Sequence, residues 1–546
     1  MNLAKIGLTG INAASHNLQT TGHNINNAAT EGYNRQSVSI STAGGQSMGS
    51  GFIGRGVAVD TINRSYDGFL YRQLVRAESG GAALTAYGTE IAQLNNLFAD
   101  RTVGISPALS KFFDSVDAVA SAPADPAARS ELLGRANSLA AQINDANAFI
   151  DAQRGDINTQ LGTVVKQINT QVENIQQLNQ RIVEARAGNP NHAPNDLLDQ
   201  RDQALKELNK LVEVRVIEQD GSFSLTVGNG QMLLGASTVF PLQVVASAAD
   251  PARLTVAYTA PVSGGGTKAV EMAETSLKGG TLGGLLQYRY EALDSAQNEL
   301  GRLAVGLATR FNEVHGNGYT QNGEPGEDFF SVAQPKVIRA QGAQGTLTVG
   351  FADIDALTGH DYRVAYDGAE YVITDQTTGQ ERYRGDIANA TSVDGLDFSS
   401  MSGATAGDSW MVQPTRNAAG SLKVELTDTS KIAAAGSAVG DTDGDNALEL
   451  AKLRSAKTMG SGTLDFNEAY SRIVNSVAVH TQSNGTAAKA QLSLIQQNMA
   501  AQQEVSGVNL NEEYVNLMQY QEQFRAASRL IDVSSTLFDT LLSLKA

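Results

Sequence analysis

One stretch of the chain matches a pattern found around catalytic nucleophiles. Gly45-Gln-Ser-Met-Gly49 fits the G-x-S-x-G motif of serine hydrolases. That chemistry requires a strand before the serine and a helix after it, so that the hydroxyl is exposed at a sharp turn. Ser47 instead lies among Gly and Ser residues, which predicts a flexible linker. A secreted hydrolase that uses Ser47 is therefore the less favoured alternative.

A second stretch matches the beginning of a calcium-binding loop. Asp441-Thr-Asp-Gly-Asp445 has the acidic spacing of an EF-hand, but that loop requires Gly and Glu where this chain has Asn446 and Lys452. Asp and Asn are also the residues that cap the starts of helices. We therefore expect a helix here, capped by Asp445 or Asn446, rather than a calcium site.

Histidines and composition give no support for metal or nucleic-acid chemistry. His16 and His23 have no third ligand nearby in the sequence, so polar packing between helices is favoured over zinc. The chain of 546 residues has no cysteine, which excludes disulfides and thiolate ligands. Its net charge of −17 disfavours nucleic acid, since phosphate binding needs clusters of Lys and Arg. We predict no metal, no cofactor and no enzyme activity.

The first residues do not look like a signal peptide or a membrane-spanning helix. The apolar residues of LAKIGLTGINAASHNLQT are interrupted by Gly, Asn and His. A signal peptide has a basic segment followed by an unbroken apolar run, and a membrane span needs about 20 apolar residues. We therefore expect no membrane partner.

The most informative pattern lies at the two ends of the chain. Apolar residues recur there in steps of three and four, which places them in one stripe along a supercoiled helix. Short helices of this kind are marginal alone in water, so we expect the two terminal helices to pair with each other. The candidate assembly interface consists of Leu8, Ile11, Leu18 and Ile25 at one end, and of Leu510, Tyr514, Leu517, Tyr520, Phe524, Ile531, Phe538 and Leu541 at the other, where Ala527 and Ser534 complete the stripe.

Between the ends, long segments have helical spacing and shorter ones alternate. Apolar seams predict bundle helices over residues 84–98, 109–119, 126–188, 293–314 and 464–505, with Asp125-Pro126 as a helix start and Gly188 near a helix end. A β element is expected near residues 212–286, with a hairpin at Asp220-Gly221. Strands are also expected at Tyr362–Ala365 and Glu370–Thr374.

These patterns predict a mainly α, discontinuous multidomain protein with β inserts. Residues 1–70 and 505–546 would form a terminal coiled-coil assembly domain of paired helices. Residues 71–334 and 428–504 would form a long helical bundle, and residues 335–427 a β-rich outer insert.

A longer motif follows the first stripe. Asn and Gly tolerate the left-handed conformation that ends helices, so the first helix should end before Gly32. The string NINNAATEGYNRQ, from Asn24 to Gln36, resembles the N-terminal signature of bacterial flagellar rod, hook and hook-associated proteins. The matching residues are Asn24, Asn26, Asn27, Gly32, Tyr33 and Arg35.

Further blocks resemble one of these families, the flagellar hook-associated protein 1 family. They are residues 51–57, 62–69, 194–202, 221–231, 303–330 and 506–514. Asn511 departs from the last block, where Asp is usual. The resemblance covers most of the chain except roughly residues 335–427.

The resemblance implies a structural adaptor of the bacterial flagellum that joins hook to filament by forming a ring of subunits. It also implies type III export without a cleaved signal peptide, and hence an extracellular location in the flagellum. The implied partners are the hook protein, the second hook-associated junction protein and a cytoplasmic export chaperone at the C-terminal helix. Another axial protein, from the hook or the distal rod, is an alternative that the long bundle and residues 506–514 disfavour.

Overall fold

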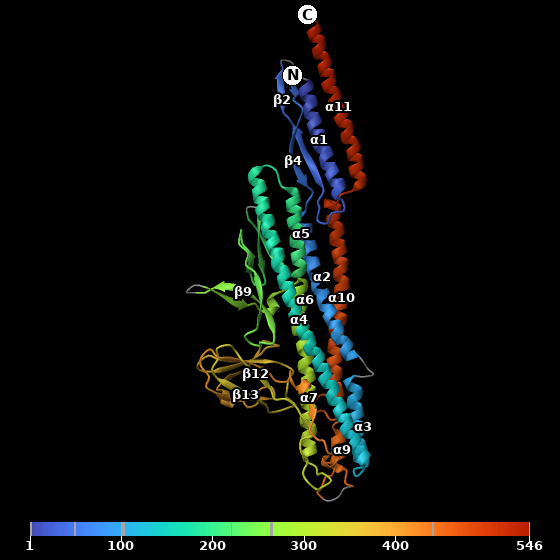
Figure 1. Ribbon diagram of the computed structural model, residues 1–546, viewed down its shortest axis with the longest axis vertical. Coiled ribbons are helices and arrows are strands. Elements are labelled where there is room, and N and C mark those ends of the chain that lie inside the picture. Colours follow the sequence, from blue (N-terminus) through green and yellow to red (C-terminus); the bar gives the residue numbers. More distant parts are fainter. Residues whose placement is uncertain are drawn as a thin grey trace.

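The computed structural model describes residues 3–48, 51–99, 104–219, 221–262, 266–438 and 442–544. The molecule is long and narrow, and both ends of the chain lie at the same end of it (Figure 1). In the described part of the chain, no helix combines the length and the apolar character needed to span a membrane.

A bundle of long helices forms the body. Its members are α2 (Gly68–Ala99), α3 (Ile105–Ser121), α4 (Pro126–Gly188), α5 (Asn195–Leu211), α6 (Gly280–Tyr288), α7 (Asp294–Gly316), α9 (Asp445–Lys452) and α10 (Phe466–Ser506). The predicted boundaries of α4 are confirmed: the Asp125 side chain accepts a hydrogen bond from Ala127 N, and the helix ends at Gly188. The predicted seam of α4 is also confirmed, because its apolar residues from Leu132 to Ile182 are buried.

Two small sheets pack against α4. One consists of β5 (Val214–Gln219), β6 (Ser222–Val227) and β7 (Gln231–Leu234). The other consists of β8 (Leu242–Ala246), β9 (Leu254–Pro261) and β10 (Thr267–Glu271). The predicted hairpin is confirmed by the pairing of β5 with β6, with Gly221 at a φ of 77°; Asp220 itself lies outside the described residues.

A separate β-rich region projects from the side of the bundle (Figure 1). Its five-stranded sheet has the order β12 (Lys336–Arg339), β18 (Ser409–Gln413), β14 (Tyr362–Tyr366), β15 (Tyr371–Asp375) and β16 (Glu381–Gly385). A second pair consists of β13 (Thr346–Phe351) and β17 (Leu396–Ser402). The two predicted strands of this region are confirmed as β14 and β15, which form an antiparallel hairpin.

The terminal segments form the remaining part of the molecule. They comprise α1 (Leu3–Asn27), β1 (Gln36–Thr42), β2 (Gly45–Met48), β3 (Gly51–Gly54), β4 (Val57–Arg64) and α11 (Leu510–Ser543). β1 pairs with β4, and β2 pairs with β3 as a hairpin. α1 lies between this β segment and α11 (Figure 1).

Candidate assembly interface

The terminal helices α1 and α11 lie side by side, joined by small residues. A Cβ atom added to Gly7 would lie 2.7 Å from Ile531 Cγ1, and one added to Gly10 would lie 3.0 Å from Ala527 Cβ. Ala527 is 7% exposed. Residues without bulk at these positions let the two helices approach closely. The buried residues of α1 are correspondingly small or polar: Gly7, Ala13, Ala14, Asn17, Thr20, Thr21 and Asn24.

This seam includes only part of the predicted apolar stripes, namely Ala527 and Ile531 on α11. Leu8 is 58% exposed, and Ile11, Leu18 and Ile25 are half-buried. On α11, Leu517, Tyr520 and Ile531 are half-buried, whereas the exposed members are Leu510, Tyr514, Phe524, Phe538 and Leu541. The candidate residues therefore divide evenly, six half-buried and six exposed, and Ile531 lies in the contact with α1. The exposed six remain accessible to another molecule, and the role of the whole set in assembly stays a prediction.

Asn24 is the centre of a polar network where the terminal helices meet the bundle. Its amide nitrogen donates to the backbone oxygen of Gln36 at 2.9 Å and to Glu513 Oε2 at 3.1 Å. Its amide oxygen accepts from the Tyr33 hydroxyl at 2.7 Å and from Gln36 N at 3.0 Å. Both donors and both acceptor positions of the amide are used. Asn24 therefore ties α1 to its following turn, to β1 and to α11.

Arg35 and Glu513 make the second connection in this network. Arg35 Nε donates to Glu513 Oε1 at 2.8 Å, and the Glu513 side chain is only 2% exposed. Arg35 N donates to the backbone oxygen of Ser506 at 2.9 Å, which lies at the end of α10. The turn after α1 is thus bound to the short connection between α10 and α11. Charged pairs buried to this degree are costly to break, because the remaining partner is left uncompensated.

The N-terminal part of α5 completes the network. Asp199 accepts from Asn34 N at 2.9 Å, from Asn34 Nδ2 at 2.6 Å and from Arg64 Nη1 at 2.8 Å. Arg64 Nη1 also donates to Asp202 Oδ2 at 2.7 Å. Burial raises the pKa of the Asp199 and Asp202 carboxyls, although Arg64 opposes the shift. The network therefore holds the end of β4 and the turn after α1 on α5.

The structure also places the other residues of the N-terminal motif. Gly32 has a φ of 81°, in the left-handed region, after a helix that ends at Asn27, as predicted. Asn27 Nδ2 donates to the backbone oxygen of His23 at 3.0 Å, whereas Asn26 is exposed. His23 lies 3.3 Å from Asp196 of α5, which confirms polar packing between helices for this histidine. His16 lies in a shallow cleft beside β4.

The partners of Asn24 in distant parts of the chain were not identified from the sequence. Asp199, Asp202 and Glu513 fall inside two of the recognised sequence blocks, but nothing in a block shows which distant residue it contacts. Four recognised stretches, residues 24–36, 62–69, 194–202 and 506–514, meet in this network, which is the structural reason for their polar residues.

Two local expectations are corrected. Ser47 lies in strand β2, opposite Phe52 of β3, so this segment is a hairpin and not a flexible linker; Gly49 lies outside the described residues. A strand follows Ser47 where a nucleophile elbow would need a helix.

Asp445 and Asn446 are inside α9 and do not cap it. Asp443 instead accepts a hydrogen bond from Asp445 N at 2.9 Å. Asp441 lies outside the described residues.

Comparisons with known proteins cover the whole chain. A family model described as the flagellar hook-associated protein FlgK helical domain matches residues 91–330. Two others, described as the D2-like domain of flagellar hook-associated protein 1 and the flagellar basal body rod FlgEFG protein C-terminal, match residues 338–414 and 499–544.

Curated relatives and a solved structure agree with these matches. Flagellar hook-associated protein 1 of Salmonella typhimurium is 36% identical, and that of Escherichia coli is 33% identical, each over 100% of both chains. The flagellar hook junction protein FlgK from Burkholderia pseudomallei is similar in structure, with a TM-score of 0.73 and 29% identity. That match covers 80% of this chain and 100% of the other.

Proposed function

Because the chain belongs to the flagellar hook-associated protein 1 family, we propose that it is a structural adaptor of the bacterial flagellum that joins the hook to the filament. In this proposal, copies assemble into a ring that meets the hook protein on one side and the second hook-associated junction protein on the other. Packing between subunits, rather than catalysis, carries the role. The protein would reach this extracellular position by type III export without a cleaved signal peptide.

The observation that carries the proposal is the exposed apolar surface of α11. Val533, Leu537, Phe538, Leu541, Leu542 and Leu544 are between 49% and 79% exposed. In Figure 1, the C-terminal end of α11 extends past the start of α1. Apolar surface gathered in this way is typical of a protein–protein contact. We therefore assign residues 1–70 and 505–546 to assembly, residues 71–334 and 428–504 to the supporting bundle, and residues 335–427 to the outside.

Replacing one exposed apolar residue of α11 tests this assignment. Phe538 is 63% exposed, so Phe538→Asp leaves the fold of the free subunit intact but places a charge in the proposed contact. We expect cells with this variant to build hooks and to lose filaments, as counted by electron microscopy. Ser535→Asp, on an exposed position of the same helix, is the matched control and should leave filaments in place. Normal filaments with Phe538→Asp would contradict the assignment.

We also propose that a cytoplasmic export chaperone covers the C-terminal helix before assembly. An amphipathic helix with anchors at three- and four-residue steps suits binding in an apolar groove. A peptide of residues 505–546 should bind the chaperone with a negative heat-capacity change. Binding should be lost when Phe524 and Phe538 are replaced by Ala. Equal binding by a chain lacking residues 505–546 would place the chaperone site elsewhere.

A further inference from the structure

The β-rich region of residues 335–427, here called the outer insert, has an apolar core that is distinct from the bundle core and that also includes Val305 of α7. Trp410, Tyr362 and Phe398 are at most 1% exposed at the centre of this core. The bundle has a separate core, which includes Phe112 and Phe311. Two cores of this kind can each remain folded when the contact between them changes.

The outer insert is connected to the bundle by a narrow stem. The chain enters it after β11 (Phe330–Ser331) and returns through β19 (Lys423–Val424), and these two short strands pair with each other. Both connections therefore lie at one place. Two adjacent strands do not fix the angle between the insert and the bundle, so that angle depends on the other contacts between them.

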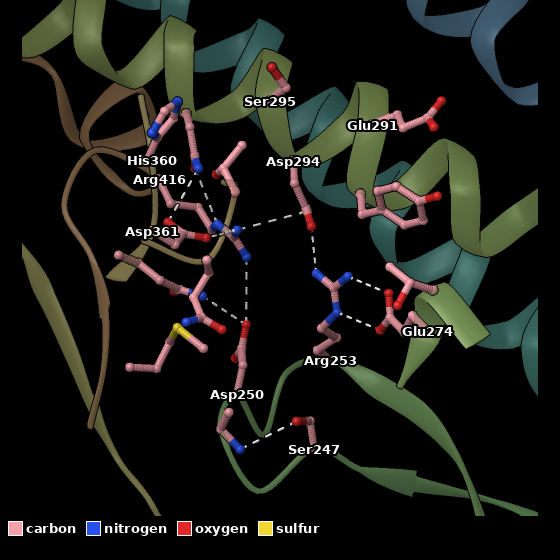
Figure 2. A pocket seen from close by; sticks show the side chains of 18 of the residues that line it. Ser247, Asp250, Arg253, Glu274, Glu291, Asp294, Ser295, His360, Asp361 and Arg416 are labelled. Atoms are coloured by element: carbon pink, nitrogen blue, oxygen red, sulfur yellow. Dashed lines mark hydrogen bonds and ion pairs between the residues drawn. The ribbon is translucent and has the colours of Figure 1, made fainter. Parts of the chain in front are cut away.

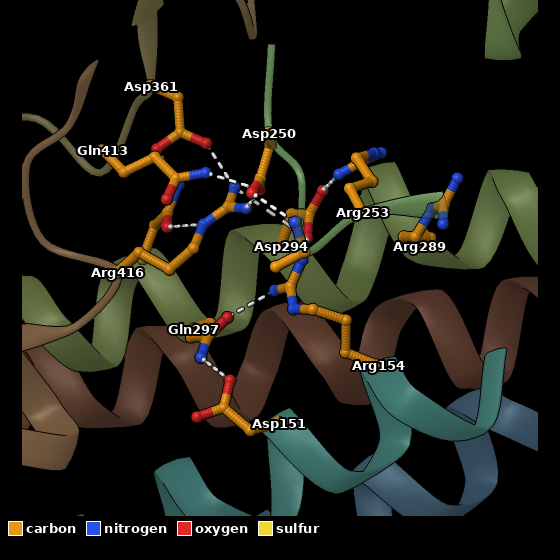
Figure 3. Close-up of polar contacts among 12 residues, drawn as sticks. Asp151, Arg154, Asp250, Arg253, Arg289, Asp294, Gln297, Asp361, Gln413 and Arg416 are labelled. Atoms are coloured by element: carbon orange, nitrogen blue, oxygen red, sulfur yellow. Dashed lines mark hydrogen bonds and ion pairs between the residues drawn. The ribbon is translucent and has the colours of Figure 1, made fainter. Parts of the chain in front are cut away.

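Those other contacts include Val305 of α7, which is buried in the core of the insert, and a polar group centred on Arg416. Its guanidinium forms an ion pair with Asp361, and Arg416 Nε donates to Asn298 Oδ1 of α7 at 3.3 Å. Asn298 Nδ2 in turn donates to Asp361 Oδ1 at 3.2 Å. Arg416 also lies 3.7 Å from Asp250 and 3.9 Å from Asp294 (Figure 3). The insert thus presents one buried guanidinium to carboxylates of α7 and of the loop between β8 and β9.

Asp294, the first residue of α7, connects Arg416 to two further arginines. Arg154 Nη1 of α4 donates to Asp294 Oδ1 at 2.8 Å, and Arg253 Nη1 donates to Asp294 Oδ2 at 2.5 Å. Arg253 also makes two hydrogen bonds to Glu274, at 2.8 and 2.6 Å (Figure 2). These seven residues, the interdomain ion cluster, are Arg154, Asp250, Arg253, Glu274, Asp294, Asp361 and Arg416.

The interdomain ion cluster is buried, which makes its geometry restrictive. The side chains of Arg416, Arg154 and Asp294 are 7%, 10% and 13% exposed. A planar guanidinium must meet its carboxylates in fixed directions, and a buried charge without its partner is strongly destabilising. A cleft of about 790 Å³ opens beside the cluster, so apolar packing does not fill the space between insert and bundle there.

We propose that the interdomain ion cluster is an electrostatic joint that holds the outer insert at one angle on the bundle, and that the insert moves as a folded unit when Arg416 and Asp361 are removed from it. Further contacts with α7 limit the movement without fixing the angle: the more exposed ion pair of Arg310 with Asp355 at 2.7 Å, the hydrogen bond from Thr415 Oγ1 to Asn298 O at 2.8 Å, and the packing of Val305 in the insert's core. This inference does not depend on the proposed role in the flagellum.

The test replaces the two cluster residues that belong to the insert, Asp361 and Arg416, and measures the angle between the insert and the bundle. The variant is Asp361→Asn with Arg416→Gln, which leaves Asp294 paired with Arg154 and Arg253. Because the chain contains no cysteine, spin labels can be placed on two introduced residues, Ala148→Cys on α4 and Ser402→Cys on β17, both exposed. The distance distribution between the labels reports the angle of the insert.

A matched control removes an ion pair of the same chemistry from the surface of the insert. Arg384 Nη2 lies 2.6 Å from Glu381, and both side chains are almost half exposed, so the control is Glu381→Gln with Arg384→Gln. We expect a narrow distribution in the parent and the control. In the joint variant, we expect the distribution to widen by about twofold or more, as for a domain released at a hinge.

Trp410, the single tryptophan of the chain, reports the insert's own folding. It is 1% exposed, and its indole N–H donates to the oxygen of Gly345 at 3.0 Å. Unchanged Trp410 emission together with a widened distance distribution is the expected result. A distribution as narrow as that of the parent would overturn the proposal. A red-shifted emission would also overturn it, because the ion pair would then support folding of the insert rather than its angle.

Discussion

Only a side-chain amide can make all four hydrogen bonds of Asn24, because two of them need a donor and two need an acceptor. Its two N–H groups face acceptors, Gln36 O and Glu513, while its oxygen faces two donors. Asn24→Asp keeps the shape but loses both donors and places a second carboxylate beside Glu513. We expect this change to lower the stability of the terminal region by roughly 3 kcal/mol. Hydrogen exchange of the α1 amides measures the loss.

Asn26 provides the control for that experiment, since it lies on the same helix and is exposed. Asn26→Asp should leave the exchange rates of α1 close to those of the parent, because surface substitutions have small effects. Parent-like protection in Asn24→Asp would show that the Asn24 network does not hold the helix.

His315 makes the stability of the bundle sensitive to mild acid. It is fully buried, its Nδ1 lies 2.7 Å from Glu327 O, and its Nε2 accepts from Ala433 N at 2.9 Å. Only the neutral ring with its proton on Nδ1 satisfies both contacts. Burial lowers the pKa of His315 below its usual value near 6.5. Its contribution is therefore fully present above the unfolded-state pKa and declines as the pH falls below it.

We expect the free energy of unfolding to fall as the pH drops below about 6.5, with a slope from this one group of up to about 1.4 kcal/mol per pH unit. Chemical denaturation at several pH values measures the slope. His315→Gln should flatten it, whereas His192→Gln, at an exposed position, should not. An unchanged slope in His315→Gln would assign the effect to another group.

At the scale of helices, α11 has two faces with different roles. Ile531 is half-buried against Gly7 of α1, whereas Phe524 is 38% exposed. Ile531→Asp should therefore separate α1 from α11 in the free subunit and reduce its helical content. Phe524→Asp should leave the helical content unchanged and block assembly alone. Circular dichroism of the purified subunit and a count of filaments on cells distinguish the two effects.

Gln523→Asp, next to Phe524 and exposed, is the control for added charge and should affect neither measurement. Equal loss of helix in Phe524→Asp and Ile531→Asp would mean that both residues belong to the seam between α1 and α11.

Periodicity predicted the buried seam of the bundle in full and the seam between the terminal helices only in part, for a physical reason. The α4 seam from Leu132 to Ile182 is apolar, so its spacing identifies the buried face directly. The contact of α1 with α11 includes Ala527 and Ile531 of the predicted stripe, but on α1 it uses Gly7 and Gly10, and small residues carry little hydrophobic signal. The α1 side of the seam was therefore not visible in the apolar pattern.

The polar network at the base of the terminal helices could be recognised from the sequence only as motifs. Asn24 looks like part of a helix end, and its bond to Glu513, near the other end of the chain, depends on the fold of the entire chain. The same holds for the interdomain ion cluster, whose arginines and carboxylates lie on α4, on α7, in the loop between β8 and β9 and in the outer insert. Pairing between such distant residues leaves no local pattern.

At the scale of the whole molecule, the terminal elements are attached to a body that does not need them for its core. The buried residues of the bundle core run in the sequence from Tyr71 to Val477. The terminal helices are held to this body mainly by polar contacts, through Arg35, Arg64 and Asp199. A chain built in this way can change the state of its ends while the bundle remains folded.

Removal of the C-terminal helix tests this division. A chain that ends at residue 509 retains both apolar cores, so we expect its bundle to melt close to the parent temperature and its Trp410 emission to be unchanged. It should fail to assemble, because the exposed residues from Val533 to Leu544 are gone. Limited proteolysis of the intact free subunit should cut within the terminal helices first, since few apolar contacts oppose their local opening. Calorimetry and protease mapping check both expectations. Protease-resistant ends in a verified monomer, or a large drop in melting temperature on truncation, would mean that the ends and the bundle fold as one unit.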